Sequence, residues 1–358
     1  MKAAVCYEFG QPLVIEELDI DQPYAGEVLV RIAAVSICAC DLHIIDGHLG
    51  GTEPVVAGHE AAGVVSEVGA GVTRVRTGDR VAISSIAFCG QCPQCSRGAP
   101  HLCEQEFALR KASRLRTKTG QIVQHGALTA AFAEQVIVDE SQLFKLPDDM
   151  SFDCAALLGC TVITGTGAAL RTAQVRAGSS VAVVGLGAVG LSVVQGAKLA
   201  AAKTIIGVDL LEKRREIARA LGATHTVNPQ TDQIETAVKN IVGAGLNYVF
   251  ITAGTTATIE EGFELLGKGG KEVIVGFQQL GTSAAFDAGG FVFAEKQVTG
   301  TVMGSADPDV DLSRLVAAHR AGQLRLDALI TARYPLTEIN EALQQMRMQR
   351  ALRNILIP

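Results

Sequence analysis

The sequence contains no tryptophan, and aromatic residues make up only 4% of its 358 residues. Charged residues are also few, at 19%, and they leave a net charge of -6. An acidic balance argues against a protein that holds nucleic acid through a basic surface. Hydrophobic residues reach 48%, which excludes disorder as the main state. At roughly 150 residues per domain, the length predicts about two domains.

Long apolar runs are also rare. The first residues, Met1–Glu8, lack the pattern of a secretory signal, and two segments without charge remain, Cys154–Leu170 and Ala177–Ala197. The second is long enough to span a bilayer, but it breaks into three close glycines and includes Ser192 and Gln195. A buried strand followed by a buried helix produces the same run. We therefore expect a cytoplasmic protein with no membrane span.

The nine cysteines cannot all be paired in disulfides, because their number is odd. Most of them lie between Cys38 and Cys160, and such clustering is typical of metal binding in a reducing compartment.

Two different rhythms run along the chain. Up to about residue 150, short β-rich runs such as Val28–Ile32, Gly63–Val68 and Arg80–Ile83 alternate with turns, which predicts an irregular, mainly antiparallel β domain. From about residue 165, strands alternate with helices, which predicts a doubly wound parallel sheet. The elements expected there are Val181–Val184, a helix through Leu199, Thr204–Val208, Glu212–Leu221, Asn247–Thr252, Ile259–Leu266 and Glu272–Val275. Amphipathic helices are expected near Leu312–Ala321 and Ile339–Met346.

A glycine-rich turn follows the strand at Val181–Val184 and opens a helix: Gly185-Leu186-Gly187-Ala188-Val189-Gly190. Gly185 permits a tight turn, Gly187 lets the backbone approach a pyrophosphate, and Gly190 lets helix and strand pack closely. The N-terminus of the helix then presents free N–H groups and a positive dipole end to the phosphates. This pattern predicts a dinucleotide site.

An acidic residue at the end of the next strand indicates which dinucleotide binds. Asp209 lies 19 residues after Gly190, where a carboxylate accepts hydrogen bonds from ribose hydroxyls and repels a 2′-phosphate. The sequence therefore favours NAD over NADP. Arg214 and Arg215 lie nearby and leave a phosphate contact open.

Four thiols fall within 15 residues, at Cys89, Cys92, Cys95 and Cys103. Overlapping CxxC steps followed by a fourth cysteine are typical of a closed, tetrahedral structural zinc site. An iron–sulfur cluster and unbound thiols are the alternatives.

A second set of possible ligands is dispersed: Cys38, His59 with Glu60, and Cys160. Alone, each of these residues is more often part of a core than a metal ligand. Together with other motifs, they make the chain resemble the zinc-dependent alcohol dehydrogenases of the medium-chain dehydrogenase/reductase superfamily. The resemblance covers essentially the whole chain and rests on Gly58-His59-Glu60, the four-cysteine segment, Gly78-Asp79-Arg80-Val81, Gly159-Cys160, the glycine-rich turn and Arg353.

The resemblance implies an α/β fold. A catalytic GroES-like β domain would comprise residues 1–161 and 303–358, and a Rossmann domain residues 162–302. It implies two Zn²⁺ ions per chain and NAD as cofactor. The catalytic zinc would be bound by two cysteines and one histidine, Cys38, His59 and Cys160, which is the ligand set known for alcohol dehydrogenases. Relatives are dimers or tetramers, so a homodimer or homotetramer is expected.

The resemblance also implies further roles. Asp41 would orient His59, Glu60 would lie beside the zinc, and Arg353 would contact the pyrophosphate of the cofactor. His43 would stand at the solvent end of a proton relay. Cys40 occupies the place where relatives have a Ser or Thr of that relay, and three interpretations remain open for it: an altered relay, an inert pocket wall, or a substitute zinc ligand.

These features predict hydride transfer between NAD and a primary alcohol or aldehyde. Ser85, Gly126 and Ala127 stand where relatives place bulky pocket walls, which favours a bulky alcohol such as an aromatic or terpenoid one. The basic residues from Arg110 to Lys118 suggest either an anionic substrate, as in a glutathione-dependent formaldehyde dehydrogenase, or a solvated loop. A non-catalytic nucleotide- or zinc-binding relative and a thiol-based zinc store or redox sensor are alternatives of another class.

Overall fold

The computed structural model describes residues 1–253, 255–278 and 281–358. The chain forms two compact units. The first comprises Met1–Thr161, Asp307–Leu315 and Leu326–Pro358, and the second comprises Val162–Ala306 and Val316–Arg325.

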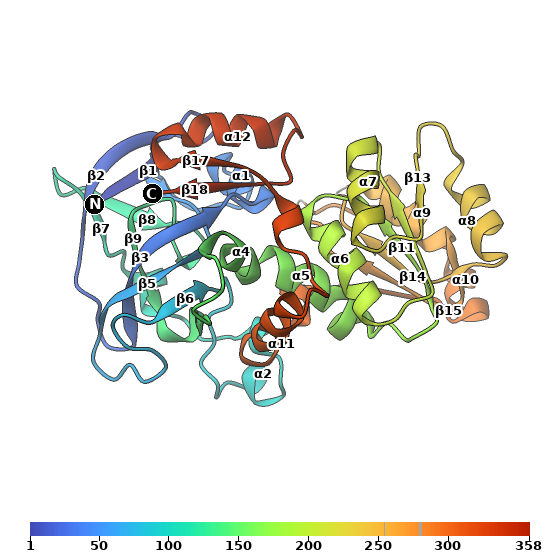
Figure 1. Ribbon diagram of the computed structural model, residues 1–358, viewed down its shortest axis with the longest axis horizontal. Coiled ribbons are helices and arrows are strands. Elements are labelled where there is room, and N and C mark those ends of the chain that lie inside the picture. Colours follow the sequence, from blue (N-terminus) through green and yellow to red (C-terminus); the bar gives the residue numbers. More distant parts are fainter. Residues whose placement is uncertain (254, 279–280) are drawn as a thin grey trace. The chain divides into compact units, whose positions relative to one another are not determined.

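The first unit is built mainly from antiparallel strands, as predicted (Figure 1). Its described residues form a closed barrel of β1 (Lys2–Cys6), β2 (Val14–Ile20), β7 (Leu115–Thr117), β8 (Ile122–His125) and β4 (Val55–Val56). A second sheet has the order β10 (Leu143–Lys145), β6 (Arg80–Ile83), β5 (Glu60–Val68), β3 (Glu27–Ser36), β18 (Arg353–Ile357) and β17 (Ile330–Pro335), and β9 (Gln135–Asp139) also pairs with β3.

The long strand β3 organises this second sheet. It pairs antiparallel with β5, β9 and the C-terminal β18, and most of its side chains are buried in the core. The helix α12 (Ile339–Arg347) covers the same core with Ile339, Ala342 and Leu343, which share one helical face. Short helices fill the connections: α1 (Ala39–Ile45), α2 (Pro93–Ser96), α3 (Ala108–Lys111) and α4 (Phe152–Ala156).

The second unit contains a parallel sheet, as predicted for a doubly wound fold (Figure 1). Among its described residues the order is β13 (His225–Val227), β12 (Thr204–Val208), β11 (Ser180–Val184), β14 (Leu246–Ile251), β15 (Leu266–Ile274) and β16 (Gln297–Gly300). The helices between them are α6 (Ala188–Leu199), α7 (Glu212–Leu221), α8 (Ile234–Val242), α9 (Thr256–Glu264) and α10 (Ala288–Ala294). Two further helices, α5 (Thr161–Gly167) and α11 (Pro308–Arg320), each contain residues of both units.

The uncharged segment Ala177–Ala197 contains β11, the glycine-rich turn and most of α6. Both elements are buried, which explains the continuous apolar run. In the described ranges, no single helix is long and apolar enough to cross a membrane. One pair of helices, Phe152–Gly159 and Thr161–Ala173, meets the length and composition limits only together and is bent by 53°.

A carboxyl group is buried without a partner in the second unit. Glu272 on β15 has no exposed surface, and neither of its carboxyl oxygens has a hydrogen-bond partner among the described residues. The glycine at position 262 of α9 makes room for it, because a Cβ there would lie 2.4 Å from Oε1 of Glu272. Burial raises the pKa of Glu272 to about 8, and the positive charge of Lys296 opposes this shift only in part.

This carboxyl predicts a pH-dependent stability. The pKa of Glu272 is about 8 in the folded chain and 4.5 in its unperturbed form. The folded chain therefore loses stability as the pH rises from about 4.5 through 8, because the folded state binds the proton more tightly than the unfolded state. Glu272→Gln should therefore raise the free energy of unfolding by about 1–3 kcal/mol at pH 9 and change it little at pH 4. Urea unfolding at both pH values measures this difference. Glu264→Gln, on the exposed face of α9, is the control, and an equal effect of both substitutions would contradict the prediction.

Candidate metal centres and nucleotide site

Asp41 links three parts of the chain through one buried carboxylate. Its Oδ2 accepts the backbone N–H of Cys38 at 2.8 Å, where α1 begins, and its Oδ1 accepts the N–H of Gly58 at 3.1 Å. Oδ1 also lies 2.6 Å from Nδ1 of His59. Gly58 has a φ of +93°, and a Cβ there would lie 2.6 Å from the backbone nitrogen of Phe132. The local backbone thus requires glycine immediately before His59.

The dispersed residues of the sequence meet in a buried cluster. Ligand atoms of Cys38, His59, Glu60 and Cys160 all lie within 4.8 Å of one another. Cys38 follows β3, Glu60 begins β5, and Cys160 follows Gly159. A Cβ on Gly159 would lie 1.9 Å from the carbonyl oxygen of Ile83, so glycine permits this close approach. Two thiols and an imidazole with a nearby carboxylate make a donor set that suits Zn²⁺.

The surroundings shift the pKa values of the cluster in different directions. The hydrogen bond to Cys38, together with burial, raises the pKa of the Cys160 thiol well above its ordinary value. Hydrogen bonds from the thiols of Cys160 and Cys40 lower the pKa of Cys38 well below its ordinary value. Burial lowers the pKa of His59, but the Asp41 carboxylate outweighs burial and leaves that pKa above its ordinary range. The Cys40 thiol is hydrogen-bonded to Cys38. It does not belong to the group of four side chains, Cys38, His59, Glu60 and Cys160, whose ligand atoms lie within 4.8 Å of one another.

Arg353 stands beside the same cluster. Its Nε and Nη2 donate to the hydroxyl of Thr161 at 2.9 and 2.6 Å, and Nη2 also lies 3.4 Å from Sγ of Cys38. Thr161 in turn donates to Glu60, whose pKa burial raises to about 8. The pyrophosphate contact expected for Arg353 stays a prediction. Sequence reasoning did not include Thr161, although its place directly after Cys160 was a usable signal.

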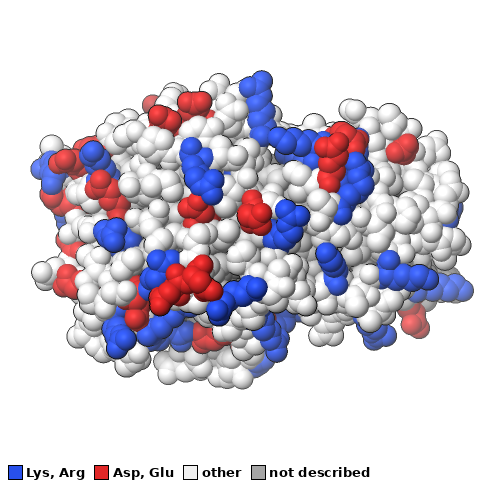
Figure 2. Space-filling model, viewed as in Figure 1, with Lys and Arg blue, Asp and Glu red and all other residues white. Residues whose placement is uncertain are grey.

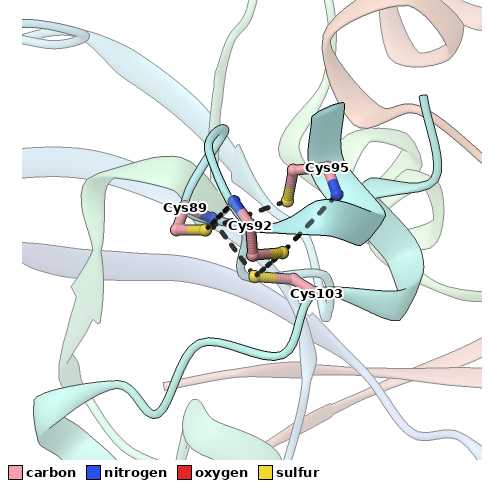
Figure 3. Close-up of side chains that lie close together, drawn as sticks. All are labelled: Cys89, Cys92, Cys95 and Cys103. Atoms are coloured by element: carbon pink, nitrogen blue, oxygen red, sulfur yellow. Dashed lines mark hydrogen bonds between the residues drawn. The ribbon is translucent and has the colours of Figure 1, made fainter. Parts of the chain in front are cut away.

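The four cysteines of the second set also come together (Figure 3). The sulfur of Cys92 lies 3.9 Å from that of Cys103, and the sulfur of Cys89 lies 4.0 Å from that of Cys95. A tetrahedral ion with bonds of about 2.3 Å to sulfur requires sulfur–sulfur distances of about 3.8 Å. Backbone N–H groups point at the sulfurs, and the N–H of Cys95 is the main cause that lowers the pKa of Cys92 to about 6. The sulfur positions therefore fit four cysteine ligands around one zinc.

The glycine-rich turn has the predicted geometry in the second unit. Gly185 has a φ of +90°, and a Cβ on Gly190 would lie 2.0 Å from the carbonyl oxygen of Gly185. At Gly187, which precedes α6, a Cβ would meet no atom within 4 Å. The turn therefore keeps open space beside the N-terminus of α6, where residues Ala188, Val189 and Gly190 begin the helix. Such a terminus binds phosphate groups.

Asp209 stands at the end of β12, beside this turn. Its Oδ2 accepts the N–H of Leu186 at 2.8 Å, and its Oδ1 accepts the N–H of Leu211 at 2.9 Å. Arg214 lies 3.6 Å from the same carboxylate. The guanidinium of Arg215 donates to the backbone oxygens of Asp209 and Leu210 and pairs with Glu212.

A cavity of about 370 Å³ lies in the first unit. Its walls include Gly126 and Ala127, two of the small residues singled out in the sequence. The other lining residues are Phe9, Ile44, Leu49, Gly50, Gly51, Thr52, Val55, Gln124 and His125. The third small residue, Ser85, does not line this cavity. Its hydroxyl group donates a hydrogen bond to the carbonyl oxygen of His59 at 3.2 Å.

Three of the five basic residues between Arg110 and Lys118 are paired with acidic residues. Arg114 is buried and pairs with Glu27 at 2.6 Å, Lys111 pairs with Glu106 at 2.7 Å, and Lys118 pairs with Asp19. Figure 2 shows acidic and basic side chains interspersed over the visible face. These pairs reduce the positive charge that the segment offers to an anion, which favours a solvated loop over a site that captures anions.

Comparison with known proteins identifies the family. Residues 24–148 match the alcohol dehydrogenase GroES-like domain, and residues 188–318 match the zinc-binding dehydrogenase domain. The chain is 36% identical to the NDMA-dependent alcohol dehydrogenase of Amycolatopsis methanolica, over 99% of this chain and 98% of the relative. The chain belongs to the zinc-dependent alcohol dehydrogenase family. It is therefore an enzyme, and the predicted membership of the medium-chain dehydrogenase/reductase superfamily is confirmed.

Solved structures of this alcohol dehydrogenase family share the fold over the whole chain. An alcohol dehydrogenase zinc-binding domain protein from Burkholderia ambifaria superposes with a TM-score of 0.96 at 35% identity, covering 100% of this chain and 98% of the other. Benzyl alcohol dehydrogenase from Acinetobacter calcoaceticus gives 0.93 at 33% identity, with coverages of 99% and 98%. The Rossmann and GroES-like architecture predicted from sequence is thus confirmed.

The buried carboxylate of Asp41 generates a prediction on metal affinity. Asp41→Asn removes the charge that holds the His59 ring, so zinc at the Cys38–His59–Cys160 site should bind about 10–100-fold more weakly. Competition with a chromophoric chelator measures the affinity. The four-thiol loop is an internal control in the same chain, since its zinc should be retained. Unchanged affinity at both sites would contradict the role given to Asp41.

Proposed function

We propose that this enzyme oxidises primary alcohols to aldehydes, and reduces aldehydes, with NAD as the hydride carrier. The observation that carries the proposal is the buried donor set of Cys38, His59 and Cys160, two thiols and one imidazole. This set contrasts with the four-thiol loop, which leaves no ligand position for a substrate. We assign the metal chemistry to the first unit and nucleotide binding to the second.

The residues of the first unit prepare the site for a metal ion. Zinc bound there would act as a Lewis acid that lowers the pKa of an alcohol and polarises a carbonyl. The short contact of His59 Nδ1 with Asp41 assigns the ring hydrogen to Nδ1 and leaves Nε2 as the ligand atom. Arg353 supplies a positive charge beside Cys38 and Glu60 and so limits the negative charge of the buried set.

Cys40 fits the altered-relay interpretation. Its hydrogen bond to Cys38 and the charge on that thiolate raise the pKa of Cys40 far above its ordinary value. The Cys40 thiol therefore stays protonated and can donate a weak hydrogen bond where relatives donate one from a hydroxyl. His43 lies one helical turn further along α1, at a half-buried position.

Asp209 supports NAD as the nucleotide. Its carboxylate is held by two backbone N–H groups at the end of β12 and would repel a 2′-phosphate. Arg215 is engaged by backbone oxygens and by Glu212, which reduces its availability for such a phosphate. Because one relative is named as NDMA-dependent, NDMA is included below as an electron acceptor.

The cavity beside Gly126 and Ala127 supports a bulky alcohol. Phe9, Leu49 and Val55 give it apolar walls, which suit an aromatic or branched hydrocarbon group better than a charged one. The name of the Acinetobacter relative, benzyl alcohol dehydrogenase, agrees with this substrate class. The basic loop, in which three of five basic residues are paired with acids, gives no comparable support to a glutathione adduct.

A screen of cofactors and alcohols tests the proposal. Purified enzyme should contain two zinc ions per chain and oxidise benzyl alcohol with NAD better than with NADP, followed by nicotinamide absorbance. Cys160→Ala should lose one zinc and more than about 99% of turnover, because the open metal site is disrupted, while NAD binding by calorimetry persists. Turnover with NDMA alone, with no response to added NAD, would contradict NAD as the exchanging substrate. One zinc or none in active enzyme would contradict the two-site assignment.

The cavity generates a second prediction, on substrate choice. Ala127→Phe should fill part of the space and lower kcat/KM for benzyl alcohol about 10–100-fold relative to that for ethanol. Ile122→Phe is the matched control, because Ile122 lies on the neighbouring β8, is 48% exposed and does not line the cavity. An equal loss for both alcohols, or the same loss in the control, would argue against this cavity as the binding site of the substrate's apolar group.

A further inference from the structure

A second histidine touches the first at the end of α1. The Nδ1 atoms of His43 and His48 lie 3.3 Å apart, and the ring centroids are 5.6 Å apart. Two neutral imidazoles can make this contact only if one Nδ1 carries a hydrogen and the other accepts it. His43 is half-buried, whereas His48 is exposed. The pair therefore joins an inner ring to solvent by a single hydrogen bond.

The backbone holds the two rings in this arrangement. The N–H of His48 donates to the carbonyl oxygen of His43 at 2.9 Å, and Gly47 between them has a φ of +73°, which glycine adopts without strain. Asp46, at the end of α1, accepts two hydrogen bonds from Arg347 of α12, at 2.8 and 2.6 Å. The loop after α1 is thus anchored to a second helix rather than left loose.

The charges near His43 keep its ring neutral. Burial is the largest cause that lowers the pKa of His43, and a positive charge on His48 lowers it further. Asp46 and the Cys38 thiolate act in the opposite direction and do not overcome these effects, and the charge of Asp46 is shared with Arg347. A neutral imidazole can accept a proton from the inner side.

We propose that His48 is the outer member of a two-imidazole relay that carries protons between His43 and solvent during alcohol oxidation. This role rests on the proposed function, because it needs a proton released by the substrate. His43 accepts a proton at Nε2 while its Nδ1–H passes to Nδ1 of His48. His48 then loses its Nε2 proton to water or to a buffer base. One proton enters the pair and one leaves it, and both rings end in the opposite tautomer. Proton exchange with solvent restores the starting tautomers before the next oxidation, and aldehyde reduction runs the sequence backwards.

His48 acts through His43 and touches no reacting atom, so it is a positioning and relay residue. The test compares wild-type enzyme with His48→Asn, which keeps a hydrogen-bonding side chain but cannot carry the proton. At low buffer concentration, kcat for benzyl alcohol should fall about tenfold in the variant, with KM little changed. Raising the MOPS concentration at constant ionic strength should restore kcat in the variant and leave the wild type unchanged. His225→Asn, an exposed histidine on β13, is the matched control.

A second readout does not depend on turnover. NMR titration of His43 should show a higher pKa in His48→Asn than in the wild type, because a neighbouring positive charge is removed. An unchanged kcat at every buffer concentration would overturn the relay, and so would a loss of kcat that buffer does not restore, which would show a structural role alone. A wild-type chain without turnover would instead overturn the proposed function, and the relay with it.

Discussion

The structure depends above all on the hydrogen bond between Asp41 and His59. A carboxylate with no exposed surface is costly unless its oxygens find donors, and Asp41 finds three: the ring of His59 and the backbone N–H groups of Cys38 and Gly58. These donors come from the start of α1 and from the turn before β5. The hydrogen bonds to this one carboxylate therefore hold the C-terminal end of β3 close to the start of β5. In this way they also hold Cys38 close to His59. The proposed metal site is thus organised by the protein's own polar contacts, which is the arrangement expected of ligands supported by a second layer of hydrogen bonds.

The same cluster explains why the end of the chain returns to the first unit. The Cys38 thiol, whose pKa is lowered, and the Glu60 carboxyl group lie in a buried place, and the guanidinium beside them belongs to Arg353, close to the C-terminus. Arg353 begins β18, which pairs with β3 at Ile355 and Ser36. The pairing of β18 with β3 therefore places the Arg353 guanidinium near the end of β3, the strand that precedes Cys38. A buried ionisable group without a partner is costly, so burying Arg353 beside Glu60 costs less than burying either side chain alone. The packing of β18 therefore depends on the residues of the cluster.

Features set by neighbouring residues could be predicted from sequence, and features set by distant ones could not. Helix α7 was expected at Glu212–Leu221 and lies there, because its amphipathic pattern and Gly222 are local signals. The glycine-rich turn could also be predicted from its own residues. The barrel closed by β4 was not, because a strand of two residues has no periodicity and exists only through its pairing with β1 and β8. The residues of the dispersed cluster were named only through a family resemblance, since no spacing connects Cys38 with Cys160. Thr161 and His48 were missed because their importance lies in the partner each contacts.

The two thiol-rich sites use different physical means, and the difference matches the roles proposed for them. In the four-cysteine loop, backbone N–H groups of Cys89, Cys92 and Cys95 point at the sulfurs, so the loop's own conformation stabilises the thiolates. In the buried cluster, charged side chains make the corresponding contacts. Asp41 is hydrogen-bonded to His59, and Arg353 is hydrogen-bonded to Cys38. Asp41 raises the pKa of His59 and Arg353 helps to lower that of Cys38, so proton gain and loss at these ligands are coupled to charged side chains. Such coupling suits the site proposed to accept an alcohol and release a proton, whereas the four-thiol loop is proposed only to hold its segment together.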